Sequence, residues 1–245
     1  MYREEHIIKV EHLTKKFGNF KANDDLTFHV KKGEIFGFLG ANGAGKTTAI
    51  RILCGLLLPT SGRIEVAGFD VYRQSNKVKK NIGYMSQKFS LYEDMTIREN
   101  FRFYGGIYGM SGKAIRQKTD QYLRKLGLEA ERNSVISSLP LGWKQKLSFS
   151  VAMMHDPAII FLDEPTGGVD PITRRQFWEM IYEAAKEGTT VFVTTHYMDE
   201  AEYCQRVSIM VDGRIEALDT PEKLKERYKV DSMEDVFIKL ARGTV

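Results

Sequence analysis

The stretch that decides the fold runs from Glu34 to Leu57 and reads EIFGFLGANGAGKTTAIRILCGLL. Its opening residues, Glu34 to Leu39, form a short apolar run typical of a buried strand. A glycine-rich loop follows, and the apolar periodicity of AIRILCGLL then predicts a helix. Strand, glycine loop and helix in this order are the setting in which the pattern GxxxxGK[ST] binds phosphate. The sequence therefore predicts a phosphate-binding loop at the carboxyl end of a strand.

The residues of this loop suit a nucleoside triphosphate bound with magnesium. Glycines let the backbone curl so that successive N–H groups point at phosphate oxygens, and the N-terminus of the helix adds partial positive charge. Lys46 is placed to reach the β- and γ-phosphates, and Thr47 to offer its hydroxyl to Mg²⁺. The residues expected to hold the nucleotide here are Gly40, Asn42, Gly43, Ala44, Gly45, Lys46, Thr47 and Thr48.

Two acidic residues end a second apolar run, AIIFLDEP, which is predicted to be another buried strand. In P-loop proteins the first acid of such a pair holds the metal, so Asp163 is the candidate ligand for Mg²⁺, through water. Glu164 is then placed to polarise an attacking water. By themselves these residues could simply end a strand in a turn, but the phosphate loop in the same chain favours the catalytic interpretation.

Two further polar residues are weaker candidates when each is considered alone. His196 stands at the C-terminal end of a third predicted strand, TTVFVTTH, and ligands gather at that end of an open parallel sheet. A single histidine there is also compatible with a structural role, and Gln87, which ends NIGYMSQ, with a solvated loop. We expect both residues at the site because the phosphate loop and the acidic pair accompany them.

Composition and charge exclude several classes of protein. The chain has 245 residues, of which 42% are hydrophobic and 28% charged, as in compact globular domains. Its longest apolar stretches are too short for a membrane helix, and MYREEHIIKV carries charges where a signal peptide needs an apolar run. The sequence therefore predicts a protein that is neither membrane-spanning nor secreted. Cys54 and Cys204 are expected to be packing residues in a reducing cytosol.

The net charge of +4 mildly favours phosphates or an anionic membrane surface as neighbours. The densest basic stretch is Lys77 to Lys80. It is either a solvated helix face or a nucleic-acid contact, and the lack of interleaved aromatic residues favours the helix face.

The order of motifs resembles that of the nucleotide-binding cassettes of ABC transporters over nearly the whole chain. That order is GANGAGKTT, Gln87, LPLGWKQ, IIFLDEP, GGVDP and His196. The resemblance implies that Gln87 senses Mg²⁺ and the membrane partner, that His196 contacts the γ-phosphate, and that Asp170 links the two active sites of a dimer. The catalytic residues are then expected to be Lys46, Gln87, Glu164 and His196, and the metal ligands Thr47, Gln87 and Asp163.

Phe17, in KKFGNF, matches the aromatic residue that stacks on adenine in this family. The alternative is that its ring belongs to the core of the N-terminal sheet.

The loop LPLGWKQ departs from the family, which usually has Leu-Ser-Gly-Gly here and contacts the γ-phosphate of ATP held by the opposite subunit. Pro140 and Leu141 replace the serine and the first glycine. The lost hydroxyl donor is worth about 1.5–3 kcal/mol to a charged phosphate. Gly142 remains to contact the partner's ATP, and a proline at the first helical position removes no useful N–H. We therefore expect a weakened contact.

Within the family, the chain is similar to cassettes of bacterial drug exporters of the daunorubicin-resistance type. The similar stretches are KKFGNFKANDDLTFHVKKGEIFGFLG, TTHYMDEAEYC and SMEDVFIKL. The resemblance implies an ATP hydrolase that uses ATP and Mg²⁺ and powers a separate transmembrane permease subunit that exports drugs or lipids. The cassette would be cytoplasmic, peripheral on the inner face of the cell membrane, and without a nucleic-acid partner. With a single phosphate loop, it must pair with a second cassette, identical or different.

Two other functions are considered. A soluble ABC ATPase that acts on ribosomes or DNA would generally show two cassettes or a long coiled-coil insertion, and this chain has neither. A binding module would hold ATP without turning it over, but the presence of Glu164 argues against this.

The expected fold is α/β: a P-loop NTPase core of the RecA-like type, with an antiparallel β subdomain and an inserted α-helical subdomain. The β subdomain is expected from the runs HIIKVEHL, LTFHV and GRIEVAGFDV. A single domain of residues 1–245 would comprise the catalytic core with the β subdomain at about 1–88 and 151–220, the helical signature subdomain at about 89–150, and a C-terminal helical tail at 221–245.

Local signals support the two helical parts. Thr96 and Glu99 form a capping-box pattern, Gly127 marks a helix end, and Ser232 begins a last helix. The aromatic stretch that begins the helical subdomain, Phe89 to Tyr92, either packs in that subdomain or docks a helix of the membrane subunit.

Overall fold

A six-stranded sheet forms the centre of the computed structural model, which describes residues 5–87 and 91–242. Its strand order is β10-β9-β3-β8-β7-β6, with parallel pairing throughout except between β9 and β10. Every residue of β3, β7 and β8 is buried, as their continuous apolar sequences predict. The strands are β3 (Ile35–Gly40), β6 (Ile82–Met85), β7 (Ile159–Asp163), β8 (Thr190–Thr195), β9 (Arg206–Val211) and β10 (Arg214–Asp219).

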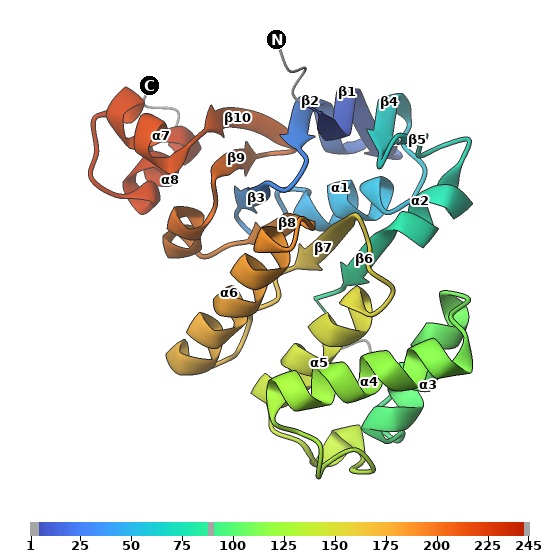
Figure 1. Cartoon of the computed structure of the whole chain (residues 1–245). Helices are drawn as coiled ribbons and strands as arrows, with labels where there is room; N and C mark the ends of the chain where they lie inside the picture. The colour runs from blue at the N-terminus through green and yellow to red at the C-terminus, as the bar shows by residue number, and fades with distance from the viewer. Residues whose placement is uncertain (1–4, 88–90, 243–245) are drawn as a thin grey trace.

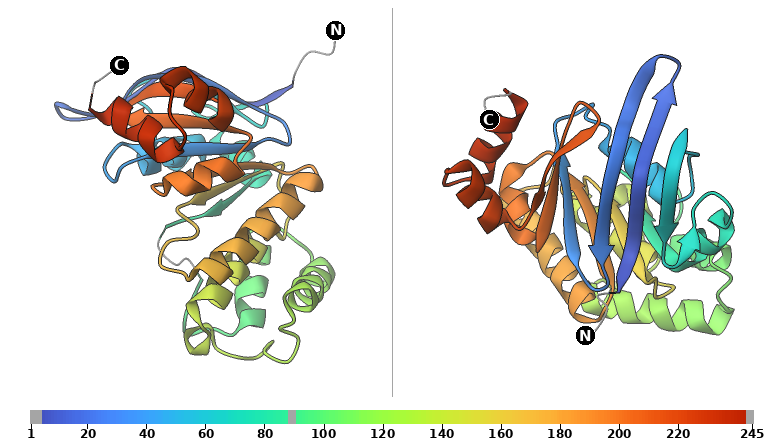
Figure 2. Two further views of the ribbon diagram at one scale, coloured as in Figure 1. Left: turned by 90° about the vertical axis from the view of Figure 1, so that its left-hand side faces the viewer. Right: turned by 90° about the horizontal axis from the view of Figure 1, so that it is seen from above.

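A second, antiparallel sheet lies over the first, with the helix that follows the phosphate loop between them (Figure 1). Its strand order is β2-β1-β4-β5. The helix α1 (Lys46–Leu53) buries Ala49, Ile50, Ile52 and Leu53 in a core shared by both sheets. Figure 2 shows β1 and β2 as one long hairpin. The strands are β1 (His6–Phe17), β2 (Phe20–Lys31), β4 (Ser61–Val66) and β5 (Phe69–Asp70).

The helix α1 is shorter than its sequence predicts. It ends at Leu53, whereas the apolar periodicity extends to Leu57. Gly55 has a φ of +66°, a left-handed conformation that ends the helix, and the amides of Leu56 and Leu57 turn back to the carbonyl of Arg51.

Three helices form a layer with its own apolar core on the other side of the parallel sheet (Figure 1). They are α3 (Ile97–Ile107), α4 (Gly112–Leu126) and α5 (Leu141–Met153), with a short 3-10 turn at Ile136–Ser138. The Thr96 hydroxyl accepts from the Glu99 amide, and the Glu99 carboxylate accepts from the Thr96 amide, so the predicted capping box is confirmed. Gly127, with a φ of +68°, ends α4 as predicted.

The helix α5 contacts two cores and so fixes the helical layer to the sheet. Leu147 and Val151 pack among the helices, whereas Phe149 and Met153 pack against the parallel sheet and α6 (Pro171–Lys186). One detail of the prediction is wrong: Pro140 is the N-cap of α5, and the first helical residue is Leu141. Pro140 has a ψ of 150°, which is extended rather than helical.

The remaining helices cover the edges of the sheets. Met233, Val236 and Leu240 of the last helix are buried in the core of the larger sheet, and the Ser232 hydroxyl caps that helix by accepting from the Asp235 amide. Among the described residues no helix combines the length and apolar character needed to cross a membrane. These elements are α2 (Ser75–Asn81), the 3-10 helix at Met198–Tyr203, α7 (Pro221–Tyr228) and α8 (Met233–Ala241).

Two predictions about side chains and the predicted fold class are also confirmed. Val78 is the only buried residue of α2, so the lysines around it form a solvated helix face. Cys54 and Cys204 are both buried and free of disulfides, and burial raises the pKa of both thiols. The α/β fold with an antiparallel sheet and inserted helices is the one expected from the sequence.

Candidate nucleotide-binding and hydrolytic site

The phosphate loop joins the end of β3 to the start of α1, as predicted. The buried Lys46 ammonium donates to the carbonyls of Gly40 (2.7 Å) and Ala41 (3.1 Å), so it lies across the loop. Gly45 has a φ of +99°, and a Cβ on it would lie 2.1 Å from the carbonyl oxygen of Ala22. Only glycine fits this position, because the loop passes directly against β2.

Asn23, which the sequence analysis missed, ties β2 to the phosphate loop. Its side chain is fully buried and its Nδ2 donates to the carbonyl of Gly45 at 3.1 Å. A polar residue at an inward-facing position of a strand is the signal that could have identified it, since a buried amide needs a partner.

Asp163 and Thr47 lie together at the carboxyl end of β7. The Asp163 Oδ1 accepts from the hydroxyls of Thr194 (2.7 Å) and Thr47 (3.3 Å). Asp163 is 1% exposed, and burial raises the pKa of its carboxyl, although both hydroxyls oppose this. Its Oδ2 is buried without any hydrogen-bond partner. A buried carboxylate oxygen left in this state suits a cation or a cation-bound water, so the residues present fit Mg²⁺.

The described residues contain no group of three or more His, Cys, Asp and Glu side chains that could hold a metal ion. A magnesium ion here would therefore depend on Asp163, Thr47 and the phosphates of the nucleotide itself, which is how Mg²⁺ is held in phosphate-loop enzymes.

Glu164 contacts the other three residues that are expected to be catalytic. Its Oε1 lies 3.3 Å from the Lys46 ammonium, and its Oε2 accepts from the Gln87 amide at 2.9 Å. The same Oε2 lies 3.1 Å from Nδ1 of His196. The side chain is only 8% exposed. A γ-phosphate that engages Lys46, Gln87 and His196 must therefore take over contacts that Glu164 makes in this structure.

The backbone of Glu164 is strained. Its φ is +50°, a left-handed conformation that is uncommon outside glycine. The amide of Glu164 holds this geometry by donating to the carbonyl and the hydroxyl of Thr194, both at 3.1 Å. Such strain is concentrated at functional sites, where surrounding contacts maintain it.

A cavity of about 300 Å³ continues from the phosphate loop to the tip of the β1–β2 hairpin. Phe17 is 50% exposed at the end of β1, so the alternative that it belongs to the core is wrong. Phe20 and Ala22 line the same cavity and were missed by the sequence analysis. The lining residues are Phe17, Phe20, Ala22, Asn42, Gly43, Gly45, Lys46, Thr47, Thr48, Gln87 and Glu164.

Two expected loop residues do not line this cavity. Ala44 is buried, and Gly40 contributes its carbonyl to Lys46.

Gly142 and Asp170 lie at a different hollow of about 300 Å³, which shares no lining residue with the nucleotide cavity. The Asp170 carboxylate caps α6 by accepting from the amides of Ile172 and Thr173, both at 3.0 Å, and from the Thr173 hydroxyl. These hydrogen bonds, the one from the Thr173 hydroxyl first, lower the pKa of Asp170. A Cβ at Gly142 would lie 2.7 Å from the Thr173 methyl, so α5 and α6 pack closely there.

The stretch from Phe89 to Tyr92 was expected either to pack in the helical subdomain or to dock a helix of the membrane subunit, and its residues differ in this respect. Phe89 lies outside the described residues. Leu91 is buried among the helices, whereas Tyr92 is exposed and packs edge-on against the exposed ring of Phe103, with 4.9 Å between their centroids. Core packing thus accounts for Leu91 and leaves an aromatic surface at Tyr92 and Phe103.

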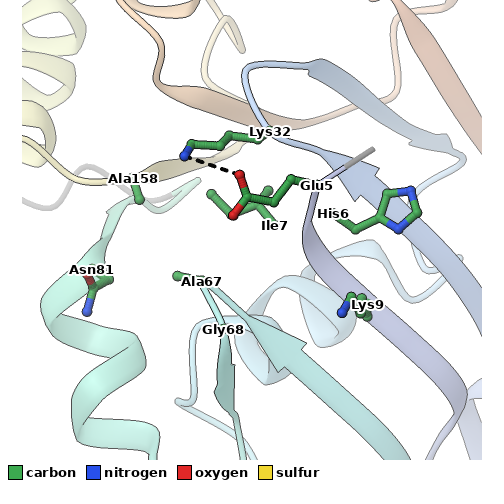
Figure 3. Close-up of a pocket in the computed structure, with 9 residues that line it drawn as sticks. All are labelled: Glu5, His6, Ile7, Lys9, Lys32, Ala67, Gly68, Asn81 and Ala158. Carbon is green, nitrogen blue, oxygen red and sulfur yellow. Dashed lines mark hydrogen bonds and ion pairs between the residues drawn. The ribbon is translucent and has the colours of Figure 1, made fainter. Parts of the chain in front are cut away.

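Another hollow, of about 630 Å³, lies elsewhere (Figure 3). Asn81 and Ala158, which line it, directly precede β6 and β7, so it lies at the amino ends of strands whose carboxyl ends carry the site. Glu5 and Lys32 pair across it at 3.5 Å (Figure 3). It contains none of the expected site residues.

Comparisons with known proteins agree with this geometry. A family model described as ABC transporter matches residues 23–167. The chain is 48% identical over 241 residues to the "Probable multidrug ABC transporter ATP-binding protein YbhF" of Escherichia coli strain K12, covering 96% of this chain and 42% of YbhF. It is 35% identical over 231 residues to a daunorubicin resistance ATP-binding protein of Streptomyces coeruleorubidus, covering 94% of this chain and 73% of that protein.

Solved structures give the same result. An ATP-binding subunit of an ABC transporter superposes with a TM-score of 0.86 at 27% identity, covering 96% of this chain and 99% of that one. An ATP-binding cassette solved as a dimer, in a post-hydrolysis state with ADP and Pi, superposes with a TM-score of 0.79 at 26% identity, covering 87% of this chain and 98% of that one. The chain spans less than half the length of YbhF. With its fold, phosphate loop and family match, this chain belongs to the ABC transporter family, as one of its ATP-binding cassettes.

Proposed function

We propose that this chain binds MgATP and hydrolyses it. The observation that carries the proposal is the position of Glu164, within hydrogen-bond or ion-pair distance of Lys46, Gln87 and His196 beside the phosphate loop. Lys46 would hold the β- and γ-phosphates and His196 the γ-phosphate. Glu164, released from these partners, would accept a proton from the attacking water.

Magnesium would neutralise charge on the β- and γ-phosphates during the reaction. Thr47 would bind it directly, Gln87 would contact it, and Asp163 would hold it through water. The unpartnered Oδ2 of Asp163 supports this assignment, because a metal-bound water would supply the missing hydrogen bond.

The cassette would act in a pair. Gly142 would contact the ATP of the second cassette through the N-terminus of α5, and Asp170 would lie between the two sites. Among the described residues the amides of Leu141 and Gly142 donate to no protein acceptor, so both are available to a phosphate oxygen. The dimeric state of the similar cassette solved with ADP and Pi supports pairing.

Closure of the pair on ATP would drive a separate transmembrane permease that exports drugs or lipids, with the cassette peripheral on the inner face of the cell membrane. The names of the two relatives, which mention multidrug transport and daunorubicin resistance, support this substrate class. The exposed rings of Tyr92 and Phe103 offer a docking surface for the permease. Ribosomes, DNA and other nucleic acids are not proposed as partners, since no relative described here points to them.

We assign the parts of the chain as follows. The core with the β subdomain would be about residues 1–88 and 151–220, the helical subdomain about 89–150, and the tail 221–245. The packing of α5 in both cores supports a helical subdomain that is joined to the catalytic core through this helix.

Phosphate release by the purified chain tests hydrolysis. We expect the wild type to release phosphate from ATP with Mg²⁺ and to stop when EDTA is added. Glu164→Gln should reduce the rate by about 10² to 10⁴, the usual contribution of a general base. Glu179→Gln is the matched control, because Glu179 is an exposed residue of α6 and should leave the rate unchanged. Equal release from the wild type and Glu164→Gln would rule out the proposed role.

A further inference from the structure

The tip of the β1–β2 hairpin brings two aromatic rings to the nucleotide cavity. Phe17 and Phe20 are direct partners in the register of the hairpin. Side chains opposite each other on an antiparallel pair project from the same face. The two rings are 50% and 64% exposed, and both line the cavity that continues to the phosphate loop. Exposed phenyl rings lose hydrophobic stabilisation unless a ligand covers them, so the pair suits an apolar, flat ligand group.

Of the two rings, Phe20 has the more direct link to the phosphate loop. It lies on β2, whose Asn23 bonds the carbonyl of Gly45 at 3.1 Å. Ala22, two positions from Phe20 and on the same face of the strand, lies against Gly45 and lines the cavity between them. Phe17 lies on β1, so it is connected to Gly45 only through its pairing with β2 across the hairpin. The distance from Phe20 to bound phosphates is therefore fixed by contacts within one strand.

The two rings are exposed and line one cavity, so each keeps surface that a ligand can cover. No ring contact joins Phe17 to Phe20 in the part of the chain that the structure describes. The ammonium of Lys15 lies over the Phe17 ring at 4.9 Å from its centroid, so one face of that ring already has a partner. A base that stacks on the other face of Phe17 can also be covered on its far side by a second ring. That ring must then lie about 7 Å from the Phe17 ring, which is twice the contact distance of carbon atoms.

From these contacts we infer that Phe20 is a second base-stacking residue, which holds the base of the nucleotide against Phe17. The inference rests on the proposed nucleotide binding. The side chains of Phe17, Phe20 and Ala22 carry no hydrogen-bonding group, so this end of the cavity recognises the area of the base and not its edge. Purine nucleotides should therefore bind more tightly than pyrimidine nucleotides, with little difference between adenine and guanine.

Binding of MgADP and MgCDP to the full chain tests the inference without turnover. Phe20→Ala should weaken the binding of MgADP by about fivefold to a hundredfold, which is the range for one base stack. It should weaken the binding of MgCDP less, because the pyrimidine base is smaller. Inorganic tripolyphosphate, used as a competitor, should bind the wild type and Phe20→Ala equally, because it has no base. Tyr72→Ala is the matched control, since Tyr72 is 63% exposed and does not line the nucleotide cavity.

Each other outcome overturns the inference in a distinguishable way. If the wild type and Phe20→Ala bind MgADP equally, the second stack is absent while nucleotide binding stands. If Phe20→Ala weakens tripolyphosphate as much as MgADP, Phe20 acts only through the shape of the phosphate loop. If the wild type binds neither MgADP nor MgATP, the proposed function fails and the inference fails with it.

Discussion

Replacing Pro140 by serine should strengthen ATP-driven pairing and leave the fold nearly unchanged. Pro140 is the N-cap of α5, with φ −57° and ψ 150°, and its carbonyl accepts from the amides of Trp143 and Lys144. Serine can adopt these angles and keep both bonds. Its oxygen can accept from an amide of the first turn, which adds about 0.5–2 kcal/mol. Loss of the proline ring raises the conformational entropy of the unfolded chain, which lowers the free energy of unfolding by about 0.4–1 kcal/mol.

These opposing changes leave the free energy of unfolding within about 1.5 kcal/mol of the wild type. The serine O–H remains free to donate to a phosphate of the second cassette, a charged hydrogen bond worth about 1.5–3 kcal/mol. A dimer of this chain carries two such loops, so the dissociation constant of the MgATP-bound dimer should fall by about a hundredfold or more.

The assay is sedimentation of the Glu164→Gln chain with MgATP over a range of protein concentrations, with and without Pro140→Ser. Pro140→Ala is the matched control, because it removes the same ring and adds no hydroxyl. If the serine and alanine variants dimerise equally, the hydroxyl makes no contact across the pair, and the reasoning about this loop is refuted.

Three other changes give distinct results. Phe17→Ala should weaken MgADP by about 1–3 kcal/mol whereas Phe17→Tyr should not, as measured by calorimetry; equal affinities would remove Phe17 from the base site. Asp163→Asn should abolish the Mg²⁺ dependence of ATP binding. It should also raise the thermal midpoint of the nucleotide-free chain, because it replaces a buried charge whose Oδ2 has no hydrogen-bond partner. A lower thermal midpoint would contradict this expectation. Asp170→Ala should lower the thermal midpoint by a few degrees through loss of the α6 cap. Because the pKa of Asp170 is lowered in the folded chain, its extra stabilisation over Asp170→Asn should be present above the ordinary value of 3.8 and disappear as the pH falls below it; a difference that persists in acid would contradict the assignment.

Where backbone and side chain act locally, the sequence was enough to predict the structure. The buried strands, the phosphate loop and the Thr96–Glu99 cap each depend on residues within one turn or one strand. The meeting of Lys46, Gln87, Glu164 and His196 was predicted because parallel strands place their carboxyl ends at one edge, and the family resemblance identified which side chains matter.

Contacts between distant segments were the part that the sequence could not supply. Phe20 and Asn23 reach the phosphate loop only because β2 packs beside Gly45. The local sequence of Asn23 indicates a buried amide that needs a partner, but not that the partner is the loop. The left-handed backbone of Glu164 is imposed by Thr194 of the next strand. The end of α1 at Leu53 is a different, local case, because Gly55 in the same stretch ends the helix although the apolar pattern continues beyond it.

We propose that two copies of this cassette close on each other when they bind ATP. The most direct test is the mass of the Glu164→Gln chain in solution, measured by light scattering with and without MgATP. Because this substitution blocks hydrolysis, it should trap the closed pair, and the account predicts twice the 28.0 kDa of the single chain only when MgATP is present. A mass of 28.0 kDa with ATP demonstrably bound would contradict it, because two copies of this loop would then be insufficient to hold the pair.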